Sequence, residues 1–211
     1  MVGTQKKGVD VVVAFVLAFV LGGCDPTSAP SSDHFEAWVR ENGGDVKDLN
    51  GAILKDGYAL IHRAAQEGRV DMLGWLKDRG ADVNAKTNSG WTPMHSAARG
   101  GRVEVMKWLK EQGADVSAKN DDGKTPMFPA ANGGHVEAMR WLKEQGVDVN
   151  ARSNDGLALM HFAAIHGRVE VMKWLKEQGV DINAKDHKGR TPLAVAGSDE
   201  AKEWLQANEA E

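Results

Sequence analysis

The sequence predicts an all-α repeat solenoid of stacked helix-turn-helix units, joined by β-turn or hairpin loops. Three series of residues recur every 33 positions along the chain of 211 residues. They are the glycines Gly57, Gly90, Gly123, Gly156 and Gly189, the glycines Gly80, Gly113, Gly146 and Gly179, and the tryptophans Trp75, Trp108, Trp141 and Trp174. A fixed period of this length indicates a solenoid, in which each unit buries its apolar face only by stacking on its neighbours.

The copy that starts near residue 87 shows how one unit is built. Thr92 and Pro93 predict the start of a first helix, because threonine caps free backbone amides and proline fits the first turn. Gly100 and Gly101 predict its end. A second helix is expected from near residue 102 to residue 112, because its apolar residues fall on one arc. Those residues are Val103, Val105, Met106 and Leu109, with Trp108 at the edge.

This unit resembles the ankyrin repeat. Residues 92–97 read Thr-Pro-Met-His-Ser-Ala, close to the Thr-Pro-Leu-His-x-Ala signature of that family, and the unit boundaries at residues 80–85 and 146–151 also match its pattern. The resemblance covers Trp38 to about Leu205. It implies a β-turn and two helices in each unit. It also implies a concave groove, lined by loop tips and first helices, in which protein partners bind.

The resemblance places an ankyrin-repeat domain at residues 34–207. Residues 34–46 contain only a second-helix pattern, which predicts a half-repeat cap. Trp38 precedes Trp75 by 37 residues, so four extra residues lie in the first loop. Five repeats are expected to start near residues 54, 87, 120, 153 and 186, and the last is truncated as a C-terminal cap.

Three departures from the period carry further expectations. Trp204 follows Trp174 by only 30 residues, which predicts a clipped final helix. Repeat four has Ala158 where repeats two, three and five have threonine, which predicts the loss of a side-chain cap worth about 0.5–2 kcal/mol. Pro129 lies just inside the first helix of repeat three and removes a backbone donor. The last two departures predict a locally softer middle of the stack.

The first residues differ in composition from the repeats. Lys6 and Lys7 precede an uninterrupted apolar run at residues 11–21. This run is shorter than the roughly 20 residues that a membrane-spanning helix needs, and it is typical of a secretory signal peptide. We therefore expect residues 1–23 to be a signal peptide.

Cys24 is the only cysteine, and it follows Leu-Gly-Gly at residues 21–23. This order resembles the lipobox of bacterial lipoproteins, which implies cleavage before Cys24 and lipid attachment to its sulfur. A plain signal peptide with an incidental cysteine, or an uncleaved anchor, are the alternatives. Residues 24–33 are rich in proline and serine, which predicts a flexible tether. The expected location is a bacterial membrane, on the side of the periplasm or the exterior.

The composition limits the possible functions. Apolar residues make up 42% and charged residues 27% of the chain, which is typical of a folded body. The net charge of −4 gives no basic footprint for nucleic acid. The second helices alternate Lys and Glu on what we interpret as a solvated face, where Lys107 and Glu111 are placed to pair. We expect a monomer.

Two residue series invite a chemical interpretation. His62, His95 and His161 share one repeat position. A metal ladder is excluded there, because stacked helices lie about 8–10 Å apart whereas each zinc ligand must come within about 2.1 Å. The resemblance implies a structural, hydrogen-bonding histidine instead. The tryptophan series is interpreted as core packing with a partly exposed edge. No catalytic constellation stands out, so we expect no metal, no cofactor and no enzymatic activity.

The resemblance implies that a partner binds at the loop tips and the first helices. Trp91 is the most informative of these residues, because it lies outside the tryptophan series, at a tip where polar residues are usual. Trp, Tyr and Arg dominate binding hot spots. The alternative is that Trp91 only covers its own loop. The candidate partner-binding residues are Tyr58, Trp91, Arg99, Lys124, Leu157, Ile165, His166 and Arg190.

These expectations combine into one functional hypothesis. The chain is expected to be a non-enzymatic protein–protein interaction module, tethered to a bacterial membrane by lipid on Cys24, that binds a protein through its concave face. The alternative keeps the fold and makes the protein a structural spacer or stability factor of the cell envelope without a single dedicated partner.

Overall fold

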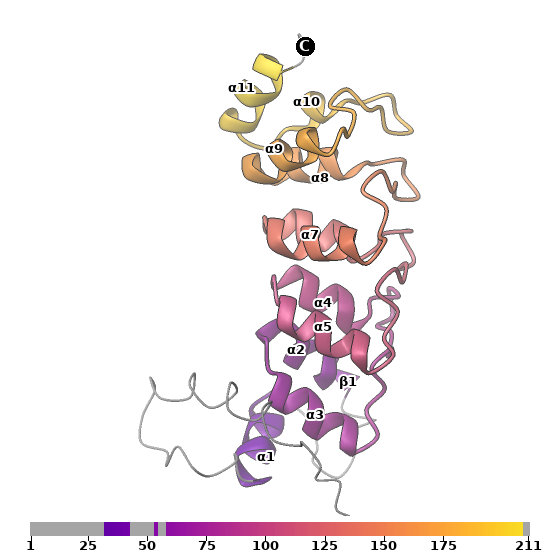
Figure 1. Ribbon diagram of the computed structural model, residues 1–211, viewed down its shortest axis with the longest axis vertical. Coiled ribbons are helices and arrows are strands. Elements are labelled where there is room, and N and C mark those ends of the chain that lie inside the picture. Colours follow the sequence, from indigo (N-terminus) through magenta and orange to yellow (C-terminus); the bar gives the residue numbers. More distant parts are fainter. Residues whose placement is uncertain (1–31, 43–52, 55–57, 209–211) are drawn as a thin grey trace, which may run out of the picture.

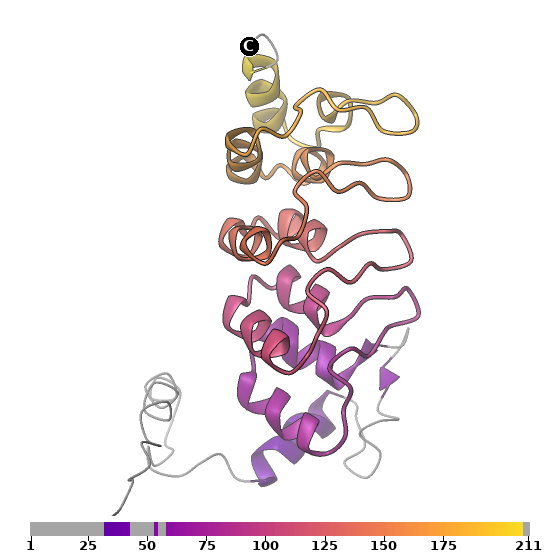
Figure 2. The same cartoon turned by 45° about the vertical axis from the view of Figure 1, so that its right-hand side comes forward.

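The computed structural model describes residues 32–42, 53–54 and 58–208. These residues form an elongated stack of helical layers, with the loops of successive layers on one side (Figures 1 and 2). The expected signal peptide, Cys24, nearly all of the tether, and the part of the predicted N-terminal cap beyond residue 42 lie outside the described residues. So does the side chain of Tyr58. The all-α repeat solenoid is confirmed.

Eleven helices belong to the described part of the chain. Helix α1 spans Ser32–Glu41 and is followed by five helix pairs, one for each repeat. The pairs are α2 (Leu60–Glu67) with α3 (Val70–Asp78), α4 (Pro93–Arg99) with α5 (Val103–Glu111), α6 (Met127–Gly133) with α7 (Val136–Glu144), α8 (Leu159–Ile165) with α9 (Val169–Glu177), and α10 (Pro192–Val195) with α11 (Asp199–Asn208). Strands β1 (Ile53–Leu54) and β2 (Tyr58–Ala59) pair antiparallel before α2.

The recurring glycines shape the loops. Gly156 has a φ of +77°, a left-handed conformation that glycine adopts without strain. A Cβ atom at this position would also lie 2.4 Å from the ring of His187 in the next loop. Neighbouring loops are joined directly, since the amide of His187 donates to the carbonyl of Asp155 at 3.1 Å. The 33-residue glycine series therefore allows the loops to stack closely.

The core runs along the whole stack. Met94, Met127 and Met160 of the first helices are fully buried. The first helices of neighbouring repeats contact each other more extensively than the second helices do, so they lie on the inner, concave side. Trp75 and Trp174 are buried while Trp108 and Trp141 are half-buried, which confirms the packing interpretation of the tryptophan series.

The C-terminal repeat is shortened in a different place from the one predicted. The final helix α11 has ten residues, and the truncated helix is α10, which has only four. The chain leaves α10 early and passes beside α8, where the amide of Gly197 donates to the carbonyl of Ala164 at 3.0 Å. A Cβ atom at Gly197 would lie 2.1 Å from the carbonyl oxygen of Ile165. The prediction of a clipped final helix was wrong.

The two sequence features behind the predicted softer middle are present in the structure, and the softness itself stays a prediction. In repeat four, Ala158 lacks the hydroxyl with which Thr191 of repeat five accepts from the amide of Ala194 at 3.4 Å. The amide of Ala158 donates to Nδ1 of His161 at 3.2 Å, but this hydrogen bond does not replace that cap. In repeat three, Pro129 is the third residue of α6. The amide at the equivalent position donates to a backbone carbonyl in repeats two and four, from Ser96 to Thr92 at 3.2 Å and from Phe162 to Ala158 at 3.4 Å, so proline removes one backbone hydrogen bond from repeat three.

The outer face is ordered by two kinds of polar contact. Lys107 Nζ lies 2.7 Å from Glu104 Oε1 and not beside Glu111, which corrects the predicted pairing. Lysines at the ends of the second helices donate to a side-chain amide of the next repeat. These pairs are Lys77 with Gln112, Lys110 with Gln145, Lys143 with Gln178, and Lys176 with Asn208.

Candidate partner-binding surface

Three histidines connect neighbouring repeats. Nδ1 of His95 accepts a hydrogen bond from the amide of Thr92 at 3.2 Å, and its Nε2 lies 3.0 Å from the carbonyl oxygen of Lys124 in the next repeat. His62 and His161 make equivalent contacts. Nδ1 of each accepts from the amide three residues before it, and Nε2 contacts the carbonyl of Trp91 for His62 and of Arg190 for His161. Because Nδ1 accepts, Nε2 carries the proton and donates to the carbonyl. The structural interpretation of these histidines is confirmed.

Burial keeps these rings neutral. All three are completely buried, and desolvation lowers the pKa of each. The pKa of His95 falls from 6.5 to about 4. The neutral ring can accept at Nδ1 while it donates at Nε2, so both hydrogen bonds persist at neutral pH.

The histidines fix the backbone at the predicted tip residues. Trp91, Lys124 and Arg190 occupy one repeat position, directly before the first helix, and the carbonyl of each is held by the histidine of the preceding repeat. Leu157 occupies the same position in repeat four. Its preceding repeat has Phe128 in place of histidine, and the Leu157 carbonyl accepts from the amide of Ser153 at 3.0 Å. The side chains at these positions are therefore displayed from an ordered backbone.

Trp91 is half-buried. Its ring centroid lies 5.5 Å from that of His95, with an angle of 43° between the planes. Its amide is also held, by the hydroxyl of Thr87 at 3.0 Å. The ring covers part of its own repeat and keeps an accessible remainder, so its role as a contact stays a prediction.

Lys124 lies over an aromatic ring that the sequence analysis did not single out. Its Nζ is 5.1 Å from the ring centroid of Phe162 and 2.9 Å from Asp122 Oδ2. Phe162, in α8, is half-buried and packs edge-on against Phe128 at 5.1 Å. A signal was present in the sequence, because the other repeats carry Arg63, Ser96, Pro129 and Val195 at the position of Phe162.

The remaining candidates lie at the ends of first helices and at the last tip. Arg99 ends α4 and is exposed, and its carbonyl accepts from His135 Nε2 at 2.9 Å. Ile165 ends α8 and is half-buried, and His166 beside it is exposed. Burial and the nearby Arg168 lower the pKa of His166.

Arg190 has a buried partner. Its guanidinium lies 2.7 Å from a carboxylate oxygen of Asp186, whose side chain is 1% exposed while that of Arg190 is 46% exposed. Burial raises the pKa of Asp186, but hydrogen bonds from the amide and guanidinium of Arg190 and the amide of Lys188 outweigh it and lower the pKa to about 2. The Arg190 guanidinium is therefore exposed at the surface, whereas the Asp186 carboxylate is buried.

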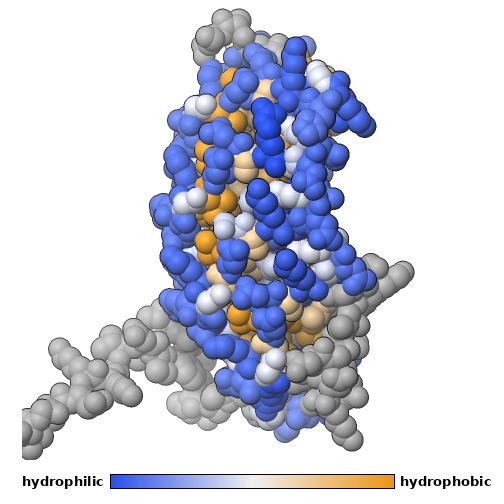
Figure 3. Space-filling view, turned by 90° about the vertical axis from the view of Figure 1, so that its right-hand side faces the viewer, coloured by the Kyte–Doolittle hydropathy of each residue, from blue (hydrophilic) through white to orange (hydrophobic). Residues whose placement is uncertain are grey.

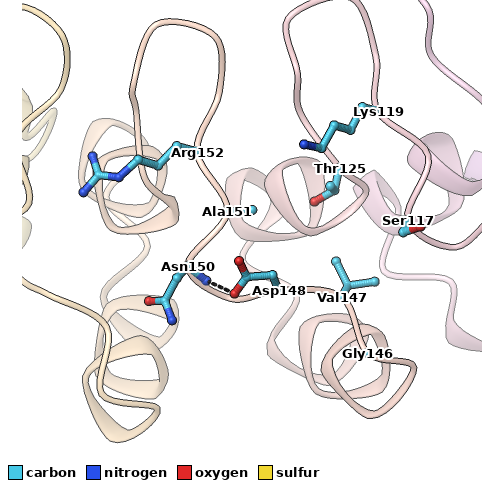
Figure 4. A pocket seen from close by; sticks show the side chains of 9 residues that line it. All are labelled: Ser117, Lys119, Thr125, Gly146, Val147, Asp148, Asn150, Ala151 and Arg152. Atoms are coloured by element: carbon cyan, nitrogen blue, oxygen red, sulfur yellow. Dashed lines mark hydrogen bonds between the residues drawn. The ribbon is translucent and has the colours of Figure 1, made fainter.

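A pocket of about 550 Å³ lies between the tails of repeats two and three (Figure 4). Two of its three charged groups, Asp148 and Arg152, are engaged in other contacts. Asp148 accepts from the amide of Asn150 at 2.8 Å, and Arg152 Nη1 donates to the carbonyls of Gly156 and Lys185 at 2.9 and 2.8 Å. The pocket therefore offers no convergent set of free polar groups. Within the described ranges, no three side chains of His, Cys, Asp or Glu gather in a way that could hold a metal ion.

Comparison with known proteins identifies the repeats. A family model described as ankyrin repeats (many copies) matches residues 61–109, and a second, described as ankyrin repeats (3 copies), matches residues 115–186. Together they cover more than half of the chain. None of the curated proteins matches it. In the part of the chain that the structure covers, no helix has the length and apolar character needed to cross a membrane.

Proposed function

Because this chain belongs to the ankyrin-repeat family, whose members generally act as non-enzymatic protein-interaction modules, we propose that it binds a protein partner through its concave loop and first-helix face. We propose further that lipid on Cys24 tethers it to a bacterial membrane, facing the periplasm or the exterior, with residues 24–33 as the flexible link.

The fixed tip backbone supports this proposal most directly. Trp91, Lys124 and Arg190 are presented at one position of repeats two, three and five, and each carbonyl is held by a buried histidine. A surface that is ordered before binding loses little conformational entropy when a partner arrives. On the face of the stack shown in Figure 3, apolar residues form a broken line along the long axis, bordered by polar residues. A partner that lies along the stack would meet several repeats at once.

Photo-cross-linking in cells tests the binding face. A photoreactive residue at Asn88, an exposed loop tip, should give a discrete adduct with one partner. The same residue at Lys107, exposed on α5, is the control and should not. Trp91→Ala should lower the yield at position 88, because the indole is expected to be an anchor. Equal or absent adducts at both positions would contradict the proposal and favour a structural spacer.

Mass spectrometry of the mature protein tests the tether. The expected N-terminal residue is a lipid-modified Cys24, and Cys24→Ser should release the protein from the membrane fraction. An intact Met1 or an unmodified Cys24 would rule out the lipid anchor and leave the binding proposal untouched.

A further inference from the structure

Repeat four differs from its neighbours on the binding face. Its tip, first-helix and helix-end positions are Leu157, Phe162 and Ile165. The equivalent residues are Trp91, Ser96 and Arg99 in repeat two, and Lys124, Pro129 and Asn132 in repeat three. Leu157, Phe162, Ile165 and the neighbouring Val195 are all half-buried, and we call them the apolar patch.

Aromatic and large aliphatic side chains that stay accessible on a folded surface mark contact sites. Phe162 is the centre of this patch, because its ring is held against Phe128 and still reaches the surface. A ring that is already ordered loses little rotamer entropy on binding.

Two cations flank the patch along the row of tips. Lys124 and Arg190 occupy the same repeat position as Leu157, one repeat before it and one after. Lys124 Nζ bonds Asp122, and an ammonium group has three donors, so two are left. Arg190 uses Nε and Nη2 on the buried Asp186, and its exposed guanidinium has further N–H donors.

The spacing of the cations sets the length of the segment that both could contact. Stacked helices lie about 10 Å apart, so Lys124 and Arg190 are about 20 Å apart across two repeats. An extended chain covers that distance in about six residues. A nucleic acid is disfavoured, because the chain has a net charge of −4 and two flanking cations can meet only two phosphates, whereas nucleic-acid binding needs a basic surface that meets many.

We propose that the apolar patch binds an extended segment of the partner, with a bulky apolar side chain on Phe162 between two acidic residues that meet Lys124 and Arg190. This inference rests on the proposed function and names the chemistry of its partner. The apolar side chain supplies most of the affinity, and the two carboxylates set register and specificity.

A displayed library of random peptides tests this chemistry on the purified full chain. Peptides of about twelve residues are long enough, since the site spans about six. Enriched sequences should have an apolar centre and acidic flanks. One enriched peptide is then synthesised, together with a counterpart in which lysines replace the acidic residues.

Charge reversal provides the matched comparison. Lys124→Glu should lower the affinity for the acidic peptide about tenfold and raise the affinity for the lysine counterpart. Lys107→Glu is the control, because Lys107 is likewise in an exposed ion pair, with Glu104, but on the opposite face. It should leave both affinities unchanged. Phe162→Ser, which installs the residue of repeat two, should weaken both peptides about tenfold or more. Circular dichroism checks that each variant is folded.

The proposal is overturned if no peptide is enriched, if the acidic and lysine peptides bind equally, or if Lys124→Glu behaves like Lys107→Glu. Its failure is distinguishable from that of the proposed function. An adduct at position 88 without peptide binding would support the proposed binding face and contradict the proposal that it binds an acidic segment. Peptide binding without an adduct in cells would support the apolar patch as a peptide-binding site and contradict the proposed function in cells.

Discussion

Two junctions of the same stack are built on different chemistry. Between repeats two and three, His95 links the amide of Thr92 to the carbonyl of Lys124. Between repeats three and four, Phe128 takes the histidine position and packs edge-on against Phe162 at 5.1 Å. The hydroxyl of Thr92 lies 2.9 Å from His95 Nδ1, whereas the equivalent hydroxyl of Thr125 is buried without a hydrogen-bond partner.

The difference shows what each junction requires. The histidine junction is directional and fixes a tip carbonyl, but it depends on a neutral ring. The phenylalanine junction does not depend on pH, and it supports the apolar patch by holding Phe162. Its drawback is an unsatisfied hydroxyl, which costs about 1–3 kcal/mol when buried. The stack can therefore contain either kind of junction, and replacing histidine by phenylalanine changes the exposed surface near the junction.

Converting the histidine junction into the other kind should have the largest effect. His95→Phe leaves the amide of Thr92 and the carbonyl of Lys124 without their histidine partner, so we expect a loss of about 2–4 kcal/mol. Urea unfolding, followed by circular dichroism near neutral pH, measures it. His166→Phe, at an exposed histidine, is the control and should change stability by less than about 0.5 kcal/mol.

The reverse exchange sharpens the comparison. Phe128→His would offer an acceptor to Thr125 and a donor to the next repeat, but it gives up the contact with Phe162. We expect a change within about 1 kcal/mol of zero. If His95→Phe proves as mild as Phe128→His, the hydrogen bonds of the histidine junction contribute little.

Of the two kinds of junction, only the histidine junction should respond to acidification. The pKa of folded His95 is about 4 against 6.5 for an ordinary histidine, so the unfolded chain binds the proton first as the pH falls. Stability is therefore complete above about pH 6.5, decreases between pH 6.5 and 4, and loses no more from this residue below that. The full shift corresponds to about 3 kcal/mol. His62 and His161 act in the same direction.

Urea titrations at several pH values measure this dependence. The His95→Phe variant should show a shallower decline than the unaltered protein between pH 6.5 and 4, because one of the titrating groups is gone. Parallel declines in the two proteins would show that His95 is not protonated on unfolding.

The sequence was sufficient for the repeat architecture because its signals are local and recur. The second helix expected near residues 102–112 is α5 at Val103–Glu111. The count from Trp174 to Trp204 revealed three missing residues but not their place, since either helix of the pair could lose them. Only the packing of Gly197 against α8 determines that α10 is the short one.

The binding face was less accessible to prediction. Lys124 and Leu157 were recognised from their repeat position, yet the contact of Lys124 with Phe162 depends on side-chain directions across two repeats. The hydrogen bonds of the three buried histidines to tip carbonyls of the next repeat likewise join residues that are 29 positions apart. The 33-residue period does not indicate such contacts between side chains and residues of another repeat.

Replacing the two junction threonines should have a smaller effect than replacing His95. Thr125→Val removes a buried hydroxyl that has no partner and keeps the shape of the side chain, so we expect stability to rise by about 1 kcal/mol. Thr92→Val removes a hydroxyl that contacts His95 and should lower stability by a similar amount. Urea unfolding of both variants separates these signs. Equal changes would mean that the Thr125 hydroxyl is satisfied in solution, for example by water, and that the phenylalanine junction carries no unmet polar group.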